Sequence, residues 1–233
     1  MRMDEIRSIW YRRPVLPAFS GLWVNNPDAN DRASSKLEQL RRAQALGFSV
    51  PETVVTNDPH DLRSLAERCG IPLVCKPMRS GYVELNGNEQ LFFTSLVDEH
   101  ALAAFATDDP TPYLFQQMIE KTCEFRVTVI GEKVFAVRLD SQVTEDSRLD
   151  WRRGDQTKLA HAADVLPRDV GERCRALVRD YGLVFGAIDL ALDTNGRYVF
   201  FEINPNGQWA WLEQMTGIPL RGALADLLTA GVA

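Results

Sequence analysis

Histidine is scarce in this 233-residue chain and its cysteines are not clustered, which argues against the commonest zinc sites. Cys69, Cys75, Cys123 and Cys174 are widely spaced, and none forms a C-x-x-C pair. A zinc site needs grouped thiolate or imidazole ligands, and the chain has only three histidines. We therefore expect reduced thiols, as is usual in cytosolic proteins.

The sequence also lacks a long hydrophobic run and an excess of basic residues. No apolar stretch approaches the roughly 20 residues that a membrane span needs, and the charged N-terminus has no apolar segment of a signal peptide. The net charge of −6 argues against nucleic acid as the main partner, because phosphate binding needs a basic surface. These absences predict a cytoplasmic protein with no membrane partner.

The composition that remains, 45% hydrophobic and 25% charged, is typical of a globular protein with one core or two small lobes. Hydrophobic periodicity and turn residues predict helices mixed with hairpins, so we expect an α+β fold with largely antiparallel sheets. The expected helices cover residues 30–46, 58–70, 97–106 and 168–181, followed by a closing helix from Pro219. The expected strands cover residues 50–56, 72–78, 90–96, 113–119, 124–130 and 133–139. A polar, mobile loop is expected over residues 140–164.

The most informative segment is the final hairpin, FGAIDLALDTNGRYVFFEINPNG. Asn195-Gly196 favours a two-residue type I′ turn, because both central residues of that turn need positive φ. This turn places Asp189 directly opposite Glu202, and Ala187 opposite Asn204. The other face of the hairpin is then apolar and is expected to be core: Ile188, Leu190, Leu192, Val199, Phe201 and Ile203.

Asp189, Glu202 and Asn204 therefore meet on one face of the predicted hairpin. Like charges directly opposite each other across a sheet are destabilising, so a cation is expected over them. Three oxygen ligands suit a hard cation such as Mg²⁺ bound together with substrate phosphates. The alternative is a solvated face whose carboxylates pair with nearby arginine or lysine side chains.

The hairpin motif, D-x-L followed by F-E-x-N-P-N-G, resembles the metal-binding signature of ATP-grasp ligases. Other parts of that family's pattern follow in the same order from about Ala33 to the C-terminus. The resemblance implies an ATP-grasp fold, in which two α+β lobes with mainly antiparallel sheets enclose the ATP site. It also implies ATP and two Mg²⁺ ions as cofactors. The lobes are expected at residues 31–115 and 116–233, after a remnant of an N-terminal domain at 1–30.

Several candidate phosphate-binding residues come from this resemblance. Lys36 in SSKLEQL and Lys76 in VCKPM resemble the two phosphate-binding lysines of the family. Ser80 and Gly81 occupy the place of its flexible glycine-rich loop, where backbone N–H groups approach the phosphate oxygens. Taken singly, a lysine at a strand end is more often a surface residue, so the joint order of the motifs carries the assignment.

The nucleoside site is expected around the strand LFQQMI. Gln117, Met118 and Ile119 resemble the hinge whose backbone reads the adenine edge. Glu124 in CEFRVTVIG matches the acidic residue that binds the ribose hydroxyls. Arg126, two residues on, matches the arginine expected near the γ-phosphate or acyl phosphate. The alternative is that Glu124 and Arg126 simply pair with each other.

Within ATP-grasp proteins, the sequence is most similar to graspetide, or microviridin-type, maturases of ribosomally made peptides. This similarity rests on five groups of residues: IWYRRP at 9–14, WVN at 23–25, VPET with TNDP, DWR at 150–152, and GQWAWL at 207–212. It implies that an Asp or Glu side chain of a precursor peptide is phosphorylated by ATP and then joined to a Ser or Thr hydroxyl or a Lys amine. Arg126 and Arg152 are expected to stabilise charge on the transferred group.

The resemblance implies one large departure from the family: we expect most of the usual N-terminal domain to be missing. Leader recognition is therefore left open by the sequence. Either a homodimer or a partner protein completes the cleft, or the chain acts on a smaller substrate. Two alternatives stay open: a RimK-like ligase that adds an amino acid to a protein or small carboxylate, and a non-catalytic ATP-binding subunit.

Overall fold

The computed structural model describes residues 8–10, 21–78, 82–85, 88–91, 93–105, 111–153 and 159–230. The helices are α1 (Pro27–Arg32), α2 (Lys36–Ala45), α3 (Pro59–Cys69), α4 (Glu99–Ala104), α5 (Glu145–Leu149), the 3-10 helix η2 (Trp151–Arg153), α6 (Arg168–Asp180), α7 (Ala210–Thr216) and α8 (Leu220–Ala230). The strands are β1 (Ser8–Trp10), β2 (Leu22–Val24), β3 (Thr53–Thr56), β4 (Leu73–Lys76), β5 (Tyr82–Leu85), β6 (Asn88–Leu91), β7 (Ser95–Val97), β8 (Tyr113–Gln117), β9 (Lys121–Ile130), β10 (Lys133–Leu139), β11 (His161–Asp164), β12 (Phe185–Asp193) and β13 (Tyr198–Asn204).

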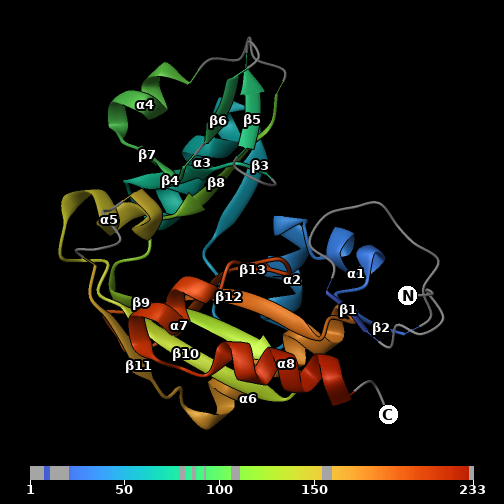
Figure 1. Ribbon diagram of the computed structural model, residues 1–233. Coiled ribbons are helices and arrows are strands. Elements are labelled where there is room, and N and C mark those ends of the chain that lie inside the picture. Colours follow the sequence, from blue (N-terminus) through green and yellow to red (C-terminus); the bar gives the residue numbers. More distant parts are fainter. Residues whose placement is uncertain are drawn as a thin grey trace.

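Two antiparallel sheets form the framework, as the sequence predicts. The smaller sheet has the order β3-β8-β4-β7 and carries α3 and α4 (Figure 1). The larger sheet has the order β11-β10-β9-β12-β13, and α6, α7 and α8 pack around it. The short stretch between β8 and β9 connects the two sheets. In the described part of the chain, no helix is long and apolar enough to cross a membrane.

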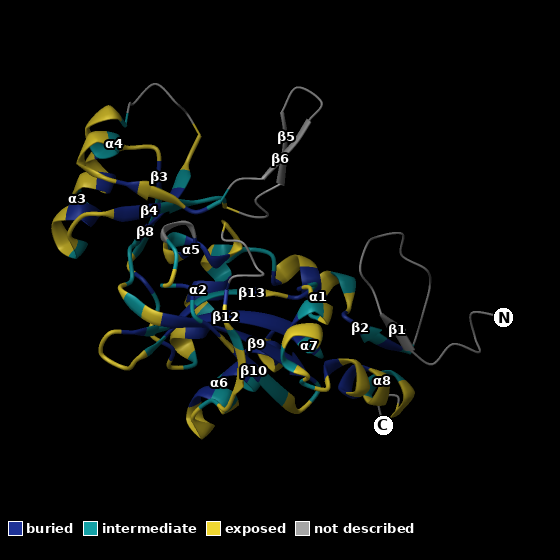
Figure 2. Ribbon diagram, turned by 60° about the vertical axis from the view of Figure 1, so that its left-hand side comes forward, coloured by how far each residue is buried: buried dark blue, intermediate teal, exposed yellow. Residues whose placement is uncertain are grey.

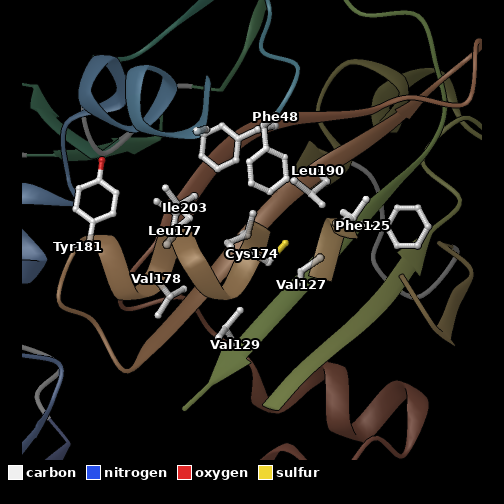
Figure 3. Close-up of a cluster of buried hydrophobic side chains, with 14 of the residues drawn as sticks. Phe48, Phe125, Val127, Val129, Cys174, Leu177, Val178, Tyr181, Leu190 and Ile203 are labelled. Carbon is white, nitrogen blue, oxygen red and sulfur yellow. The ribbon is translucent and has the colours of Figure 1, made fainter. Parts of the chain in front are cut away.

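The central strands of the larger sheet, β9 and β12, are buried over almost their whole length (Figure 2). On one face, Cys174, Leu177 and Val178 of α6 pack against Val127 and Val129 of β9 (Figure 3). On the other face, apolar side chains of α7 and α8 pack against β9 and β10. Successive strand residues point to opposite faces, so the residues between the core positions of β9 lie on the second face. This alternation places Glu124 and Arg126 on the side opposite α6.

The predicted helix over residues 30–46 is wrong, because two helices occupy this region. The side chain of Asn26 accepts hydrogen bonds from the backbone N–H groups of Asp28 and Ala29, and Pro27 starts α1. A break at residues 33–35 then separates α1 from α2. The predicted strand over 90–96 is likewise two strands, β6 and β7. The helix from Pro59 is confirmed: Asp58 caps it, and it stops at Gly70 with φ +80°.

The predicted mobile loop over residues 140–164 is wrong where the structure describes it. The segment contains α5, η2 and β11, the last of which pairs with β10. Thr144 caps α5, and Ser147 Oγ donates to the carbonyl oxygen of Ser141 at 2.7 Å. The segment is held by local contacts between polar side chains and the backbone. Such contacts leave no periodic pattern of apolar residues in the sequence, so the helices were not predicted.

The register of the final hairpin is confirmed at the predicted metal-binding residues and wrong near the turn. Asp189 pairs with Glu202 and Ala187 with Asn204, but a β-bulge follows, so Leu190 pairs with Phe200. The turn is longer than two residues: Asp193 Oδ1 accepts from the N–H groups of both Asn195 and Arg197. The extra loop residue shifts the pairing, and the bulge at Phe201 restores it.

The bulge changes which phenylalanine is in the core. Phe200 is fully buried against Phe48, whereas Phe201 is only partly buried and faces the other side of the sheet. The prediction of Phe201 as a core residue is therefore wrong. Its ring lies on the same side as Asp189 and Glu202.

A glycine after this hairpin gives a first stability prediction. A Cβ atom added to Gly207 lies 2.3 Å from Ala187 Cβ and 3.3 Å from Asn204 O. Gly207→Ala should therefore lower the free energy of unfolding by roughly 1–3 kcal/mol. Gly222→Ala in α8 is the control, because a Cβ there meets nothing within 4 Å and alanine favours a helix. Urea denaturation measures both, and equal effects would contradict the tight contact.

Candidate active site

A cavity lies between the two sheets. The smaller sheet contributes Val74 and Lys76, the larger sheet contributes Glu124, Asp189 and Glu202, and residues 148–152 close one side. Among the residues predicted from the sequence, nine line it: Lys36, Lys76, Gln117, Met118, Ile119, Glu124, Arg152, Asp189 and Glu202.

Two other predicted residues do not line the cavity. Arg126 is buried behind the cavity wall, where it contacts Asp189. Asn204 is exposed and does not line the cavity; its Oδ1 accepts from the backbone N–H of Asn206 at 2.9 Å. Ser80 and Gly81 lie outside the described residues. The structure therefore brings together two of the three predicted metal ligands.

Three neighbouring strands place three charged residues in one row. Arg126 of β9 pairs in register with Asp189 of β12, which pairs in register with Glu202 of β13. Arg126 Nη1 donates to Asp189 Oδ1 at 2.8 Å, and both side chains are 8% exposed. Strand β12 is thus flanked by a cation on one side and a carboxylate on the other. Sequence reasoning identified the carboxylate pair and named Arg126 as a candidate phosphate-binding residue, but it did not predict the ion pair of Arg126 with Asp189.

The second carboxylate of the row, Glu202, also has cationic neighbours. Lys36, at the start of α2, forms an ion pair with Glu202 Oε2. Arg152 Nη1 lies 3.5 Å from Glu202 Oε1, while Arg152 also pairs with Asp150 at 2.8 Å. Lys36, Arg126 and Arg152 thus balance Asp150, Asp189 and Glu202. Arginine and lysine side chains thus compensate the like charges, as the alternative interpretation expects, but Asp189 is buried and not on a solvated face.

These contacts shift the pKa values of the two carboxyl groups in opposite directions. Burial raises the pKa of Asp189, although Arg126 acts against the shift, and the nearby Glu202 carboxylate adds to it. Burial also opposes ionisation of Glu202, but the charges of Lys36 and Arg152 hold its pKa well below its usual value. Glu202 is therefore the more firmly ionised of the pair.

The donor chemistry of the row fits a hard cation. Asp189 and Glu202 offer only oxygen atoms, which is the ligand type that Mg²⁺ prefers when phosphates supply the other positions. In the described part of the chain, no group of three His, Cys, Asp or Glu side chains is arranged to hold a metal ion. A metal in this cavity therefore needs ligands from a bound substrate or from a nearby amide such as Asn204.

Two lysines lie over the ring of Phe201. Lys76 Nζ lies 4.6 Å and Lys121 Nζ 5.4 Å from the ring centroid. Lys121 Nζ is also 3.0 Å from Glu124 Oε1, and both side chains are 6% exposed. Glu124 thus pairs with Lys121 and not with Arg126. Sequence reasoning missed both Lys121 and Phe201. The only sequence signal for Lys121 was its position three residues before Glu124. Phe201 was missed because the bulge turns it to the other face of the sheet.

Comparison with known proteins agrees with this architecture. Residues 29–228 match the family of RimK-like ATP-grasp domains. The fold is similar to a RiPP-associated ATP-grasp ligase of Chryseobacterium gregarium in complex with ADP and a leader and core peptide, with 29% identity and a TM-score of 0.87 over 97% of this chain and 77% of that chain. It is also similar to the macrocyclase MdnC of Microcystis aeruginosa, bound with the precursor peptide MdnA, with 27% identity and a TM-score of 0.85 over 99% of this chain and 81% of that chain.

Sequence relatives point to ligases as well. A probable alpha-L-glutamate ligase of Xanthomonas oryzae is 25% identical over 221 residues, which cover 92% of this chain and 71% of that protein. The carbamoyl phosphate synthase large chain of Myxococcus xanthus is 22% identical over 204 residues, or 84% of this chain, and the match spans only 18% of its length. The fold predicted from the sequence is confirmed, and this protein belongs to the RimK-like ATP-grasp family.

Proposed function

We propose that this protein is an ATP-dependent ligase that activates an Asp or Glu side chain of a ribosomally made peptide and joins it to a Ser or Thr hydroxyl or a Lys amine. The observation that carries the proposal is the cavity between the sheets, where the row Arg126–Asp189–Glu202 faces Lys36 and Arg152. The similarity to a ligase in complex with ADP and a leader and core peptide supports the peptide as substrate.

In this proposal the nucleotide occupies the cavity along its length. Gln117, Met118 and Ile119 contact the adenine, and Glu124 accepts hydrogen bonds from the ribose hydroxyls. Lys36 and Lys76 bind the triphosphate, and Ser80 and Gly81, outside the described residues, cover it. Lys121 holds Glu124 in place through their 3.0 Å ion pair.

Asp189, Glu202 and Asn204 are the proposed ligands of magnesium. When bound there, the metal would supply positive charge that neutralises the phosphates during phosphoryl transfer. Lys36 and Arg152 then turn from Glu202 toward the phosphate oxygens, because an ammonium or guanidinium group binds phosphate as well as carboxylate. Arg126 stays with Asp189 and holds its carboxylate in position. Two of the three cations that balance the row in the free protein, Lys36 and Arg152, thus become ligands of the substrate.

The proposed reaction has two steps. A carboxylate oxygen of the peptide attacks the γ-phosphorus of ATP, ADP leaves, and an acyl phosphate forms. The hydroxyl or amine then attacks the acyl carbon, the carbon–oxygen bond to phosphate breaks, and the nucleophile loses a proton to the released phosphate or to water. Arg152, with 44% of its side chain exposed, is placed to stabilise charge on the transferred group. No nucleophile of the protein is needed, because the chain mainly positions the reactants.

A second candidate function is the addition of an amino acid to a protein or small carboxylate, which the similarity to the glutamate ligase favours. Mass spectrometry separates the two. After incubation with ATP, Mg²⁺ and the peptide encoded beside this protein's gene, cross-linking removes one water from the peptide per bond. An increase by the mass of an amino acid residue would replace the proposal with the second candidate, and ATP hydrolysis with an unmodified peptide would contradict both.

The protonation of Lys76 gives a pH prediction for nucleotide binding. Burial, together with the charge of Lys36, lowers the pKa of Lys76 to about 8. The side chain is therefore charged at pH 7 and mostly neutral at pH 9, so ADP affinity should fall about tenfold across that interval. Lys76→Arg stays charged and should show a much flatter pH profile. Calorimetric titration with ADP at both pH values measures this, and identical profiles would remove Lys76 from the phosphate site.

A further inference from the structure

The side-chain amide of Gln39 pairs with the backbone of β13 beside Glu202. Gln39 lies on α2 and is 3% exposed. Its Nε2 donates to the carbonyl oxygen of Ile203 at 2.9 Å, and its Oε1 accepts from the N–H of Ile203 at 3.1 Å. Nε2 also donates to the carbonyl oxygen of Ala33 at 2.6 Å. The amide thus pairs with Ile203 as the backbone of a further strand would.

These bonds lie at the open edge of the larger sheet. Strand β13 is the last in the sheet order, so its outward N–H and C=O groups have no neighbouring strand. Gln39 satisfies these groups at Ile203, and the carbonyl oxygen of Ser49 accepts from Phe200 N at 2.8 Å. These two contacts lie on either side of Glu202 and of the bulge at Phe201. The segment from α2 to Ser49 therefore fixes the edge strand on both sides of Glu202.

The same turn of α2 also holds the side chain of Glu202. Lys36 and Gln39 are three residues apart and lie on one face of the helix. Lys36 binds the carboxylate of Glu202, while Gln39 binds the backbone of the next residue. We infer that Gln39 is a positioning residue that fixes the Glu202 carboxylate against Lys36 and thereby sets the geometry of the proposed metal and phosphate site. This inference rests on the proposed function.

The amide is suited to this task because of its two kinds of atom. The N–H of Ile203 needs an acceptor, and the carbonyl oxygens of Ile203 and Ala33 need donors, so one orientation of a glutamine satisfies all three. Methionine matches its length without any of these bonds, and alanine leaves room for water in its place. In both variants α2 loses its tether to β13, and the contact between Lys36 and Glu202 loosens.

The first test needs no nucleotide. An amine-reactive reagent is added to the wild type, Gln39→Met, Gln39→Ala and the control Gln44→Met, whose exposed glutamine lies on the same helix. Peptide mass mapping follows the modification of Lys36, 14% exposed, relative to Lys133, 55% exposed. Lys36 should be modified several times faster in both Gln39 variants and at the wild-type rate in the control. Unchanged Lys36 reactivity in folded Gln39 variants would overturn the inference.

The second test uses the active protein. Partners of metal ligands typically change metal affinity or activity about 10- to 100-fold, so the Mg²⁺ concentration for half-maximal ADP formation should rise by about tenfold in the Gln39 variants. The KM for the peptide should stay near the wild-type value, because Gln39 does not line the cavity. Equal Mg²⁺ dependence would also contradict the inference. Absence of ADP formation by the wild type would contradict the proposed function, and Lys36 reactivity would still decide the role of Gln39.

Discussion

Replacing Glu202 with glutamine is expected to lower the rate of ADP formation by roughly 100- to 1,000-fold, a loss typical of removing one electrostatic contact to a transition state. The substitution keeps the shape of the side chain and removes the charge that Lys36 and Arg152 surround. It also removes one of the two carboxylates proposed to hold magnesium. A coupled assay of ADP release at saturating ATP and Mg²⁺ measures the effect.

The fold should survive this change. In this variant Lys36 stays close to solvent and Arg152 stays paired with Asp150. The melting temperature of Glu202→Gln should therefore stay near that of the wild type. Glu132→Gln is the control, because its side chain is 76% exposed and pairs only at the surface with Arg179. That variant should keep full activity. ATP turnover by Glu202→Gln within threefold of wild type, at unchanged Mg²⁺ dependence, would remove the metal assignment.

Replacing Arg126 with methionine is expected to be the most destabilising single change at the site. It leaves Asp189 buried beside Glu202 without its cation. Breaking a buried ion pair by removing one partner costs roughly 3–5 kcal/mol, because the remaining charge is uncompensated. Urea denaturation at pH 8, without Mg²⁺ or nucleotide, measures the change in the free energy of unfolding.

The pH dependence and a double variant identify the cause. Without Arg126 the pKa of Asp189 in the folded protein rises further above its unfolded value. The folded protein then binds the proton more tightly, so the deficit is fully present above the raised pKa and shrinks as pH falls through it. Arg126→Met combined with Asp189→Asn should recover most of the lost stability. A deficit that persists in the double variant at every pH would show that packing, not the charge of Asp189, causes it.

The sequence predicted correctly those features that neighbouring residues determine. Asp58-Pro59 predicted the start of α3, and the Asp189–Glu202 pairing followed from the hairpin and its alternating faces. The turn itself has one residue more than predicted, and the bulge at Phe201 compensates for it. The register at the site was therefore right although the turn type was wrong, and the mistake placed Phe201 on the core face.

The charge balance of the site depends on contacts between segments that are far apart in the sequence. Local sequence patterns do not predict such contacts. Arg126 opposite Asp189 is set by the pairing of β9 with β12, and Lys36 beside Glu202 by the packing of α2 on β13. The motif order placed these residues in one site but did not show which charges compensate each other. Gln39 gave no signal at all, because a glutamine in a helix is ordinarily a surface residue.

The most direct test of the account follows the oxygen atoms of the substrate peptide. The peptide is prepared with ¹⁸O in its Asp and Glu side-chain carboxylates and incubated with the protein, ATP and Mg²⁺ in ordinary water. If the carboxylate is activated as an acyl phosphate, each new bond transfers one carboxylate oxygen to the released phosphate, so ¹⁸O appears in inorganic phosphate in proportion to product. Product formation with phosphate free of ¹⁸O would contradict carboxylate activation at this site.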